Sequence, residues 1–386
     1  MYRASAVSRR GFVGGLATAL GTLGSAPARW PGLSPLHDLH PAGPTDDYDA
    51  LAKLGNNENP YGPPDSVLQA MTTAFKYANR YGYPDGGIVT AIASHHGVSA
   101  DQVMLGAGSG EILDVCCTAL LQNGRKVVGS DPSYNILFNR ATSVKADAIK
   151  VPLLSDYRQD IPGLIAATRA NARDVGFVYL CNPNNPTGRL VTKAEVRLFL
   201  DSIPEDVPVL IDEAYHHFVD DASYGTSVEY AMGRRPIIVT RTFSKIAGLA
   251  GMRLGYGLAP RDFVQQLRPW ATGSISAVVK WGAVAALADT ASQERVKRLT
   301  IQLREKTSAD LRALGYDVIP SDTNFFMVHV RRQVQPVIEA FREHGVIVGR
   351  AFPPMTEHVR VSVGTADEMQ RFMTAFTEIV AQSRPS

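Results

Sequence analysis

The stretch VGFVYLCNPNNPTG, residues 175–188, begins as a predicted β-strand and ends as a predicted loop. Its first seven residues carry no charge and are rich in β-branched and aromatic side chains, so we expect both faces of the strand to be buried. Strands of this kind are typical of parallel sheets that helices cover on both faces. The asparagines and prolines that follow predict a loop at the carboxyl end of the strand.

Similar short runs recur along the chain and alternate with longer amphipathic stretches, which indicates a mainly parallel sheet covered by helices. Some helix starts are recognisable, because Thr192 and Glu195 form a capping box in which each side chain satisfies a free backbone N–H group of the other residue. We therefore predict an α/β fold. The runs predicted as strands are 102–106, 126–131, 148–153, 175–181, 208–213, 236–240 and 253–259.

The pattern changes near residue 292, which predicts a second domain. A long charged amphipathic helix to about residue 314 precedes TNFFMVHV, a helix around 334–344, GVIVGR and HVRVSVGT, as in a small α+β domain. We expect the segment before the large-sheet pattern to pack with this small domain. The predicted organisation is a signal peptide at 1–28, a Pro-rich linker at 29–47, an N-terminal segment at 48–75, a large domain at 76–291 and a small domain at 292–386.

The composition favours a globular protein with a small-molecule ligand. The 386 residues are 45% hydrophobic and 20% charged, which allows a sizeable core and more than one domain. The formal net charge of +2 includes no basic stripe and no acidic tail, so nucleic acid and a membrane surface are not expected partners. The three cysteines have no disulfide or metal-ligand spacing, and we expect them to be buried.

The N-terminus predicts export. SRRGFV, residues 8–13, leads into a weakly apolar run that ends in Ala26-Pro27-Ala28, the pattern of a twin-arginine signal with cleavage after Ala28. The alternatives are an uncleaved anchor and a chance pair of arginines, but the run is short and rich in glycine and alanine. We expect a periplasmic or extracellular protein that is free of the membrane after cleavage, or a cytoplasmic one if the signal is not used.

The turn GAGSGE, residues 106–111, lies between a predicted strand and an amphipathic stretch. Its backbone N–H groups and the start of the following helix could hold a phosphate. Two alternatives are equally open from this motif alone. A dinucleotide site would use Asp131 on a ribose, although Glu111 stands at the third glycine position, and a plain tight turn would bind nothing.

Later strand ends decide between these alternatives. Asn185, Asp212 and Lys245 each follow a different predicted strand, and the carboxyl ends of parallel strands form the ligand site of an open α/β sheet. Asp212 follows three apolar residues, so we expect it to be partly buried and to need a cationic partner, which a protonated ring nitrogen would supply. With a phosphate cradle, these residues fit pyridoxal 5′-phosphate.

On these residues the chain resembles the fold-type I aminotransferases of class I/II, most closely the histidinol-phosphate aminotransferase branch. The matching segments cover nearly all of residues 52–376 in family order: NNENPYGPP, YGYPDG, GAGSGE, DPSY, NPNNPTG, DEAY, RTFSKIAGLAGMRLGY, TNFF and VRVSVGT. The resemblance implies a pyridoxal-phosphate-dependent transferase fold, with a large mainly parallel-sheet domain that has helices on both faces and a smaller α+β domain.

The resemblance also implies a role for individual residues toward the cofactor. Lys245 would form a Schiff base with it, and Asp212 would pair with its pyridine nitrogen. Asn185 and Tyr215 would hydrogen-bond its ring oxygen, and Tyr134 would stack on its ring. The phosphate would be held by Ser109, Gly110, Thr242, Ser244, Arg253 and, from the neighbouring subunit of a homodimer with shared active sites, Tyr83.

For the substrate, the resemblance implies that Arg360 clamps a carboxylate and that Asn59 lines the pocket. The family segment G-[IV]-[IL]-V-R reads GVIVGR here, so Gly349 displaces the substrate-binding arginine by one position, to Arg350. The implied reaction moves an amino group between an amino acid, or histidinol phosphate, and a 2-oxo acid such as 2-oxoglutarate. Export of the chain argues against a role in histidine biosynthesis, so the donor stays open.

Three other functions compete with transamination as interpretations of the sequence. Another fold-type I pyridoxal-phosphate reaction, such as decarboxylation or elimination, is barely separated from it by sequence. A nicotinamide dehydrogenase would use GAGSGE but would leave Lys245, Asp212 and Asn185 without a shared task. A non-enzymatic binding protein has no need of a Schiff-base lysine. We expect no metal site, because the adjacent pairs His95-His96 and His216-His217 lack ligand spacing and fit packing roles.

Overall fold

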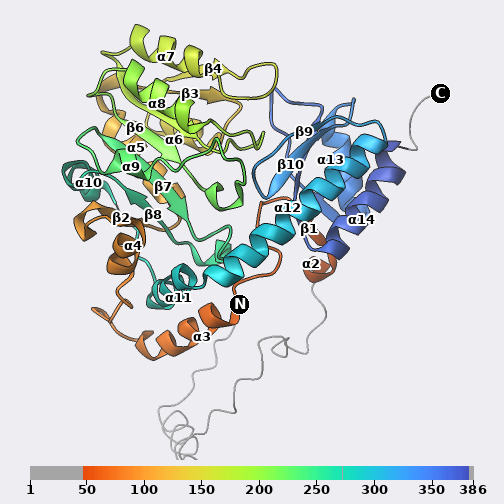
Figure 1. Cartoon of the computed structure of the whole chain (residues 1–386), viewed down its shortest axis with the longest axis horizontal. Coiled ribbons are helices and arrows are strands. Elements are labelled where there is room, and N and C mark those ends of the chain that lie inside the picture. The colour runs from red at the N-terminus through yellow and green to blue at the C-terminus, as the bar shows by residue number, and fades with distance from the viewer. Residues whose placement is uncertain (1–46, 272, 382–386) are drawn as a thin grey trace, which may run out of the picture. The chain divides into compact units, whose positions relative to one another are not determined.

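The computed structural model describes residues 47–271 and 273–381 of the chain (Figure 1). The predicted signal peptide, 1–28, and all of the predicted linker except residue 47 lie outside the described residues. From Leu51 onward the described residues form one compact unit, and the site discussed below lies wholly within it. None of the described helices has both the length and the apolar character that crossing a membrane requires.

The largest sheet in the described chain has seven strands in the order β2-β8-β7-β6-β5-β3-β4. All neighbours are parallel except at β8, which runs antiparallel to both β2 and β7. Each predicted strand is confirmed, with ends that shift by two residues at most. The strands are β2 (Val103–Gly106), β3 (Lys126–Asp131), β4 (Ala148–Pro152), β5 (Val175–Cys181), β6 (Val209–Asp212), β7 (Ile237–Thr242) and β8 (Gly255–Leu258).

Helices cover both faces of this sheet (Figure 1). Along β5, Phe177 and Tyr179 enter one hydrophobic core, whereas Val178 and Leu180 enter the other, as the two-residue period of a strand requires. This double burial explains why the strand has no polar face. One core includes α5 (Ser109–Leu120), α6 (Ile136–Ser143) and α10 (Arg261–Leu267), and the other includes α4 (Ile88–His96), α7 (Ile161–Ala170), α8 (Lys193–Ser202), α9 (Val228–Ala231) and α11 (Ala277–Ala288).

The C-terminal part contains two small sheets and a third core. β12 (His358–Ser362), β10 (Phe325–His329) and β9 (Val318–Ile319) form an antiparallel sheet in that order. The predicted helices 292–314 and 334–344 are confirmed as α12 (Thr290–Ala313) and α13 (Val334–Glu343), and α14 (Ala366–Phe376) follows them. Aromatic rings from α13 and α14 pack together here, with Phe341 and Phe372 stacked at 5.4 Å between centroids.

The N-terminal segment 48–75, which we expected to pack with the small domain, divides between the two parts. β1 (Ala52–Leu54) pairs in parallel with β11 (Val346–Val348) of the C-terminal part. In contrast, α3 (Asp65–Ala74) packs along α11 of the large-sheet part. The absence of a side chain at Gly282 allows this packing, because a Cβ there would lie only 2.6 Å from Met71 Cγ.

Candidate active site

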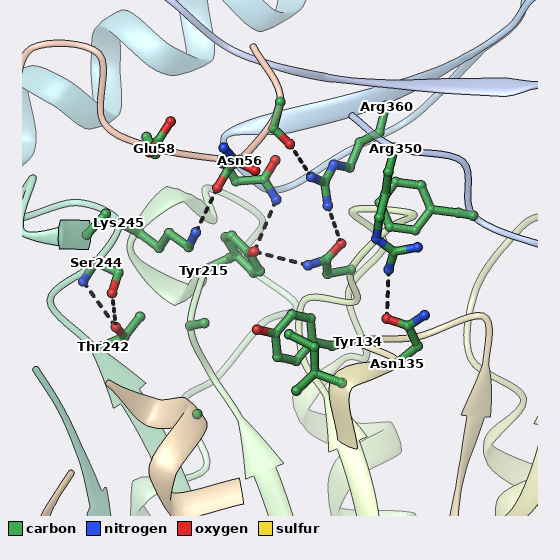
Figure 2. A pocket seen from close by; sticks show the side chains of 18 of the residues that line it. Asn56, Glu58, Tyr134, Asn135, Tyr215, Thr242, Ser244, Lys245, Arg350 and Arg360 are labelled. Atoms are coloured by element: carbon green, nitrogen blue, oxygen red, sulfur yellow. Dashed lines mark hydrogen bonds between the residues drawn. The ribbon is translucent and has the colours of Figure 1, made fainter. Parts of the chain in front are cut away.

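A cavity of about 900 Å³ lies at the carboxyl ends of β5, β6 and β7. The start of α5 closes it on one side, and the residues after β1, together with β11 and β12, close it on another. Figure 2 shows the side chains converging on this space. All predicted site residues line the cavity except Tyr83 and Asn59, so it gathers Ser109, Gly110, Tyr134, Asn185, Asp212, Tyr215, Thr242, Ser244, Lys245, Arg253, Arg350 and Arg360.

Lys245 reaches the cavity from the loop after β7. Its Nζ donates to the backbone oxygen of Asn56 over 3.1 Å and lies 5.6 Å from the ring centroid of Tyr215. Burial and, next, the positive charge of Arg360 lower the pKa of Lys245 to about 8. A sizeable fraction of this amine is therefore uncharged at neutral to mildly alkaline pH, which is the form that attacks an aldehyde.

Asp212 ends β6 and is 3% exposed. Its Oδ2 accepts a hydrogen bond from Tyr179 Oη over 3.1 Å, and its Oδ1 accepts one from Thr240 Oγ1 over 3.2 Å. Burial raises the pKa of Asp212 to about 6, and no lysine or arginine of the described chain forms an ion pair with it. A buried carboxylate without a protein cation is suited to a cationic ligand group.

Tyr179 and Thr240 were not predicted from the sequence as partners of Asp212. Their positions follow from the sheet, because Asp212 is paired in register with Thr240 on β7 and with Cys181 on β5, two residues beyond Tyr179. Neither the order of the strands nor their register was predicted. A polar hydroxyl in an otherwise apolar strand was the available signal, and Thr240 gave it at the end of PIIVT.

The first turn of α5 and Arg253 form a place for an anion. Within the described structure no side chain caps this helix, and its N-cap, Gly108, has φ 79°. A Cβ at Gly108 would collide with the Arg253 guanidinium, and one at Gly255 would collide with the backbone N of Ser109, so the two glycines allow close approach. Free N–H groups at a helix start and a nearby arginine favour a phosphate.

The hydroxyls of Thr242, which ends β7, and of Ser244 complete this anion site. Thr242 Oγ1 hydrogen-bonds Ser244 Oγ over 2.9 Å, and Arg253 Nη1 donates to the same Ser244 Oγ over 3.3 Å. Arg253 follows a single short helical turn, Ala250–Met252, and itself has φ 56°. The chain between Lys245 and Arg253 is therefore looped, as its glycines predict.

Tyr215 and Tyr134 approach the cavity from the loops after β6 and β3. Tyr215 Oη accepts hydrogen bonds from Asn185 Nδ2 over 3.2 Å and from Asn57 Nδ2 over 3.1 Å. Burial raises the pKa of Tyr134, and the negative charge of Asp212 raises it further. Both phenols therefore stay protonated at neutral pH.

Arg360 on β12 is 7% exposed and has no acidic partner in the described chain. Its Nη1 donates to Asn185 Oδ1 over 2.8 Å and its Nη2 to the Gly55 oxygen over 2.6 Å, while Nε has no hydrogen-bond partner. Its guanidinium lies over the rings of Phe352 and Phe325, and burial lowers its pKa to about 10. A buried guanidinium with a free donor favours an anionic ligand group.

Gly349 explains why the next arginine is displaced along the chain. The Gly349 N–H donates to the Arg360 oxygen over 2.8 Å, and a Cβ at Gly349 would lie 3.2 Å from Arg360 Nε. Arg360 thus occupies the space that a side chain at position 349 would need. Arg350 instead lies at a more exposed wall of the cavity, where its Nη2 donates to Asn135 Oδ1 over 2.7 Å (Figure 2).

Asn59 does not line the cavity, which corrects its predicted role. Its Nδ2 donates to the Ile246 oxygen over 2.9 Å and its Oδ1 accepts from the Tyr61 N–H over 3.0 Å, so it braces the residue after Lys245. The wall is formed instead by its neighbours Asn56, Asn57 and Glu58. NNENP was recognised as a motif, but sequence could not decide which of its polar side chains faced inward.

Tyr83 lies outside the cavity of its own chain. Its Oη donates to the Ile275 oxygen over 2.6 Å, and Lys280 Nζ lies 5.1 Å from the centre of its ring. Tyr83 therefore adds nothing to the site of the same subunit. A role in a neighbouring subunit stays a prediction.

Two histidines and a buried ion pair lie outside the cavity lining. Arg241 Nη2 donates to Glu213 Oε2 over 2.7 Å, and both side chains are almost fully buried. The rings of His216 and His217 approach to 3.6 Å between centroids. Burial and, next, the Arg241 charge lower the pKa of His217 to about 3 and hold the pKa of His216 well below its ordinary value, so these rings pack as neutral groups.

Pyridoxal phosphate fits this arrangement on the chemistry of its donors. The amine of Lys245 has a lowered pKa, the carboxylate of Asp212 is buried without a protein cation, and the helix start beside Arg253 is uncapped in the described structure. These three features match an aldehyde, a protonated ring nitrogen and a phosphate in turn. A dinucleotide would leave the first two features without a partner.

Comparison with known proteins agrees with this assignment. The family model described as aminotransferase class I and II matches residues 50–376. A histidinol-phosphate aminotransferase of Moorella thermoacetica is 34% identical over 338 residues, which cover 86% of each chain. The crystal structure of histidinol-phosphate aminotransferase from Sinorhizobium meliloti in complex with pyridoxal-5′-phosphate is similar with a TM-score of 0.80 and 27% identity, covering 93% of this chain and 100% of that one.

Fold alone does not separate transamination from related reactions. L-Threonine-O-3-phosphate decarboxylase from Porphyromonas gingivalis has a TM-score of 0.72 at 20% identity, covering 84% of this chain and 98% of that one. The family match and the relatives of higher identity carry the distinction. The chain therefore belongs to the aminotransferase class I and II family, the pyridoxal-phosphate-dependent transaminases that its sequence resembles.

Proposed function

We propose that the protein transfers an amino group from an amino acid, or from histidinol phosphate, to a 2-oxo acid such as 2-oxoglutarate, with Lys245 as the covalent anchor of the cofactor. The observation that carries this proposal is that Lys245 and Arg360 face one cavity while Arg360 has no acidic partner in the described chain. A substrate with an amino group and a neighbouring anion would bring one group to each residue. The names of the relatives support histidinol phosphate as a donor.

Bound pyridoxal phosphate supplies a ring that withdraws electrons from the bonds at the amino-bearing carbon. Asp212 would keep the ring nitrogen protonated, since a buried carboxylate stabilises a positive charge beside it. Tyr179 and Thr240 hold one oxygen of Asp212 each and so fix its orientation. The first turn of α5 and Arg253 fix the opposite end of the cofactor.

Lys245 moves the proton. As a free amine, its Nζ would take the proton from the amino-bearing carbon of the substrate and pass it on within the cavity. A pKa of about 8 suits both directions of this transfer near neutral pH. Arg360 holds the substrate anion and thereby orients the carbon that loses the proton.

Two features of assembly and location belong to the same proposal. The protein acts as a homodimer in which Tyr83 reaches the cofactor phosphate of the partner subunit, supported by its position outside its own cavity. Light scattering should give a dimer, and Tyr83→Phe should weaken cofactor retention. A fully active monomer would contradict this assembly.

SRRGFV supports export by the twin-arginine route, and this route suits a protein that folds around its cofactor first. Arg9→Lys combined with Arg10→Lys should keep the protein in the cytoplasm of a host with that route, as immunoblots of cell fractions would show. Export of the double variant at the normal level would contradict a twin-arginine signal.

The substrate is tested with protein that lacks residues 1–28. Single half-reactions are followed by the loss of the cofactor's visible band when each amino acid or histidinol phosphate is added. We expect rapid conversion of at least one donor to its carbonyl product, with the band restored by 2-oxoglutarate. Release of carbon dioxide without a carbonyl product would contradict transamination.

A further inference from the structure

Asn57 is a buried asparagine in an unusual backbone conformation. It is 1% exposed, follows β1 by three residues and has φ 54°, a left-handed value that few residues other than glycine adopt. Glycine would satisfy the backbone equally well. The backbone conformation therefore does not account for the asparagine side chain at this position.

Ser362 on β12 fixes the orientation of the Asn57 amide. The Asn57 N–H donates to Ser362 Oγ over 2.8 Å, and Ser362 Oγ donates in turn to Asn57 Oδ1 over 2.9 Å. With the Ser362 hydroxyl on Asn57 Oδ1, the Asn57 Nδ2 is left as a free donor. That donor lies 3.1 Å from Tyr215 Oη.

Asn185 reaches the same hydroxyl from the other side, and its orientation is fixed as well. Arg360 has only donors, so the Asn185 oxygen must face Arg360 Nη1 at 2.8 Å and the Asn185 Nδ2 must face Tyr215 at 3.2 Å. A phenol oxygen has two lone pairs and one hydrogen. Both lone pairs of Tyr215 are therefore occupied by amide donors, as the dashed lines at Tyr215 in Figure 2 show.

We propose that Asn57 is a positioning residue that, with Asn185, leaves the Tyr215 hydroxyl only one role, that of a hydrogen-bond donor into the cavity. The acceptor there is the ring oxygen of pyridoxal phosphate, so this inference rests on the proposed role of Tyr215. A hydrogen bond donated to that oxygen draws off negative charge that would otherwise hold a proton on the nitrogen of Lys245. Asn57 thus sets how readily the Lys245–cofactor bond loses its proton.

The test compares Asn57→Gly and Asn57→Asp with wild type by pH titration of the visible band of the cofactor-loaded protein, without substrate. Asn57→Gly suits the left-handed backbone and removes only the side chain. Asn57→Asp keeps the shape but replaces the donor with an acceptor, which would draw the Tyr215 hydrogen away from the cavity. Asn123→Gly is the matched control, because Asn123 also has a left-handed φ, of 58°, but is exposed and does not line the cavity.

We expect the band pKa to rise by about one pH unit in Asn57→Gly and by more in Asn57→Asp, in the same direction as in Tyr215→Phe. Asn123→Gly should leave the band pKa unchanged. Melting of the cofactor-free variants, followed by circular dichroism, separates this effect from loss of fold, since a purely structural Asn57 would change the melting temperature and not the band pKa.

Two results would overturn the inference. A wild-type band pKa in both Asn57 variants, beside a shifted one in Tyr215→Phe, would show that Tyr215 donates without Asn57. An unshifted Tyr215→Phe would remove the donor role itself. Neither result touches the proposed transamination, which fails if the wild-type protein forms the band and converts no amino donor to its carbonyl product.

Discussion

Arg360 on β12 donates a hydrogen bond from Nη1 to Oδ1 of Asn185, in the loop after β5, over 2.8 Å. This bond joins the proposed anchor for the substrate anion to a residue that also holds Tyr215. Substrate and cofactor groups therefore depend on one hydrogen-bonded set, and a change at Arg360 is expected to affect both.

Arg360→Lys should raise the KM for a carboxylate donor by about 10²-fold, because a lysine ammonium cannot give the paired hydrogen bonds of a guanidinium. KM and kcat are measured with the donor identified by half-reaction screening. Lys53→Arg, on β1 away from the cavity lining, serves as a surface control and should behave as wild type. An unchanged KM in Arg360→Lys would mean that another residue binds the substrate anion.

Asp212→Asn should lower kcat/KM by about 10³-fold, since the ring nitrogen loses the buried negative charge that keeps it protonated. The matched control is Asp131→Asn, which also changes an aspartate at a strand end but one that pairs with Lys150 at 3.5 Å and does not line the cavity. Steady-state kinetics of both variants check this. Equal losses in the two would contradict a specific role for Asp212.

The rate at which pyridoxal phosphate binds covalently to the cofactor-free protein should rise with pH around a midpoint of about 8, because the uncharged Lys245 amine attacks the aldehyde. Stopped-flow absorbance measures this rate. Arg360→Met should move the midpoint upward, since the Arg360 charge lowers the pKa of Lys245. A midpoint near the ordinary lysine pKa, with or without Arg360, would contradict the account.

The buried histidines should make the fold sensitive to acid. His217 has a folded pKa of about 3, below the ordinary histidine pKa of 6.5, so the unfolded chain takes up a proton first as the pH falls from 6.5. The folded state is therefore most stable above pH 6.5 and loses about 1–2 kcal/mol at pH 5 through this group.

His217→Phe keeps a ring beside His216 and removes the titration. Urea unfolding at pH 7 and pH 5 should show a smaller drop in the free energy of unfolding for the variant than for wild type. Equal drops would mean that His217 takes up its proton as readily in the folded protein as in the unfolded chain.

The strands and most of the site were predictable because they depend on local pattern. The apolar strand 175–181 and the polar residues that follow each strand identify the carboxyl edge of the sheet, and Asp212 and Lys245 follow from that rule. The glycines of GAGSGE likewise predict a tight turn before a helix. These features need no knowledge of distant contacts.

The predictions that failed concern contacts between segments that are distant in the sequence. Asn57 and Asn59 lie in the same motif, and only the packing of β1 beside β11 and β12 decides that Asn57 faces Tyr215 while Asn59 faces Ile246. The division of residues 48–75 between two parts of the fold depends on α3 meeting a glycine of α11. Neither contact can be predicted from the residues that are adjacent in the sequence.

The central claim is that Lys245 anchors the cofactor, and one measurement tests it most directly. Protein loaded with pyridoxal phosphate is reduced with borohydride, which makes the lysine–cofactor bond permanent, and its peptides are mapped by mass spectrometry. The account predicts the reduced cofactor on Lys245 alone, with no modified peptide and no visible band in Lys245→Ala. Stoichiometric modification of a different lysine, or an intact band in Lys245→Ala, would contradict it.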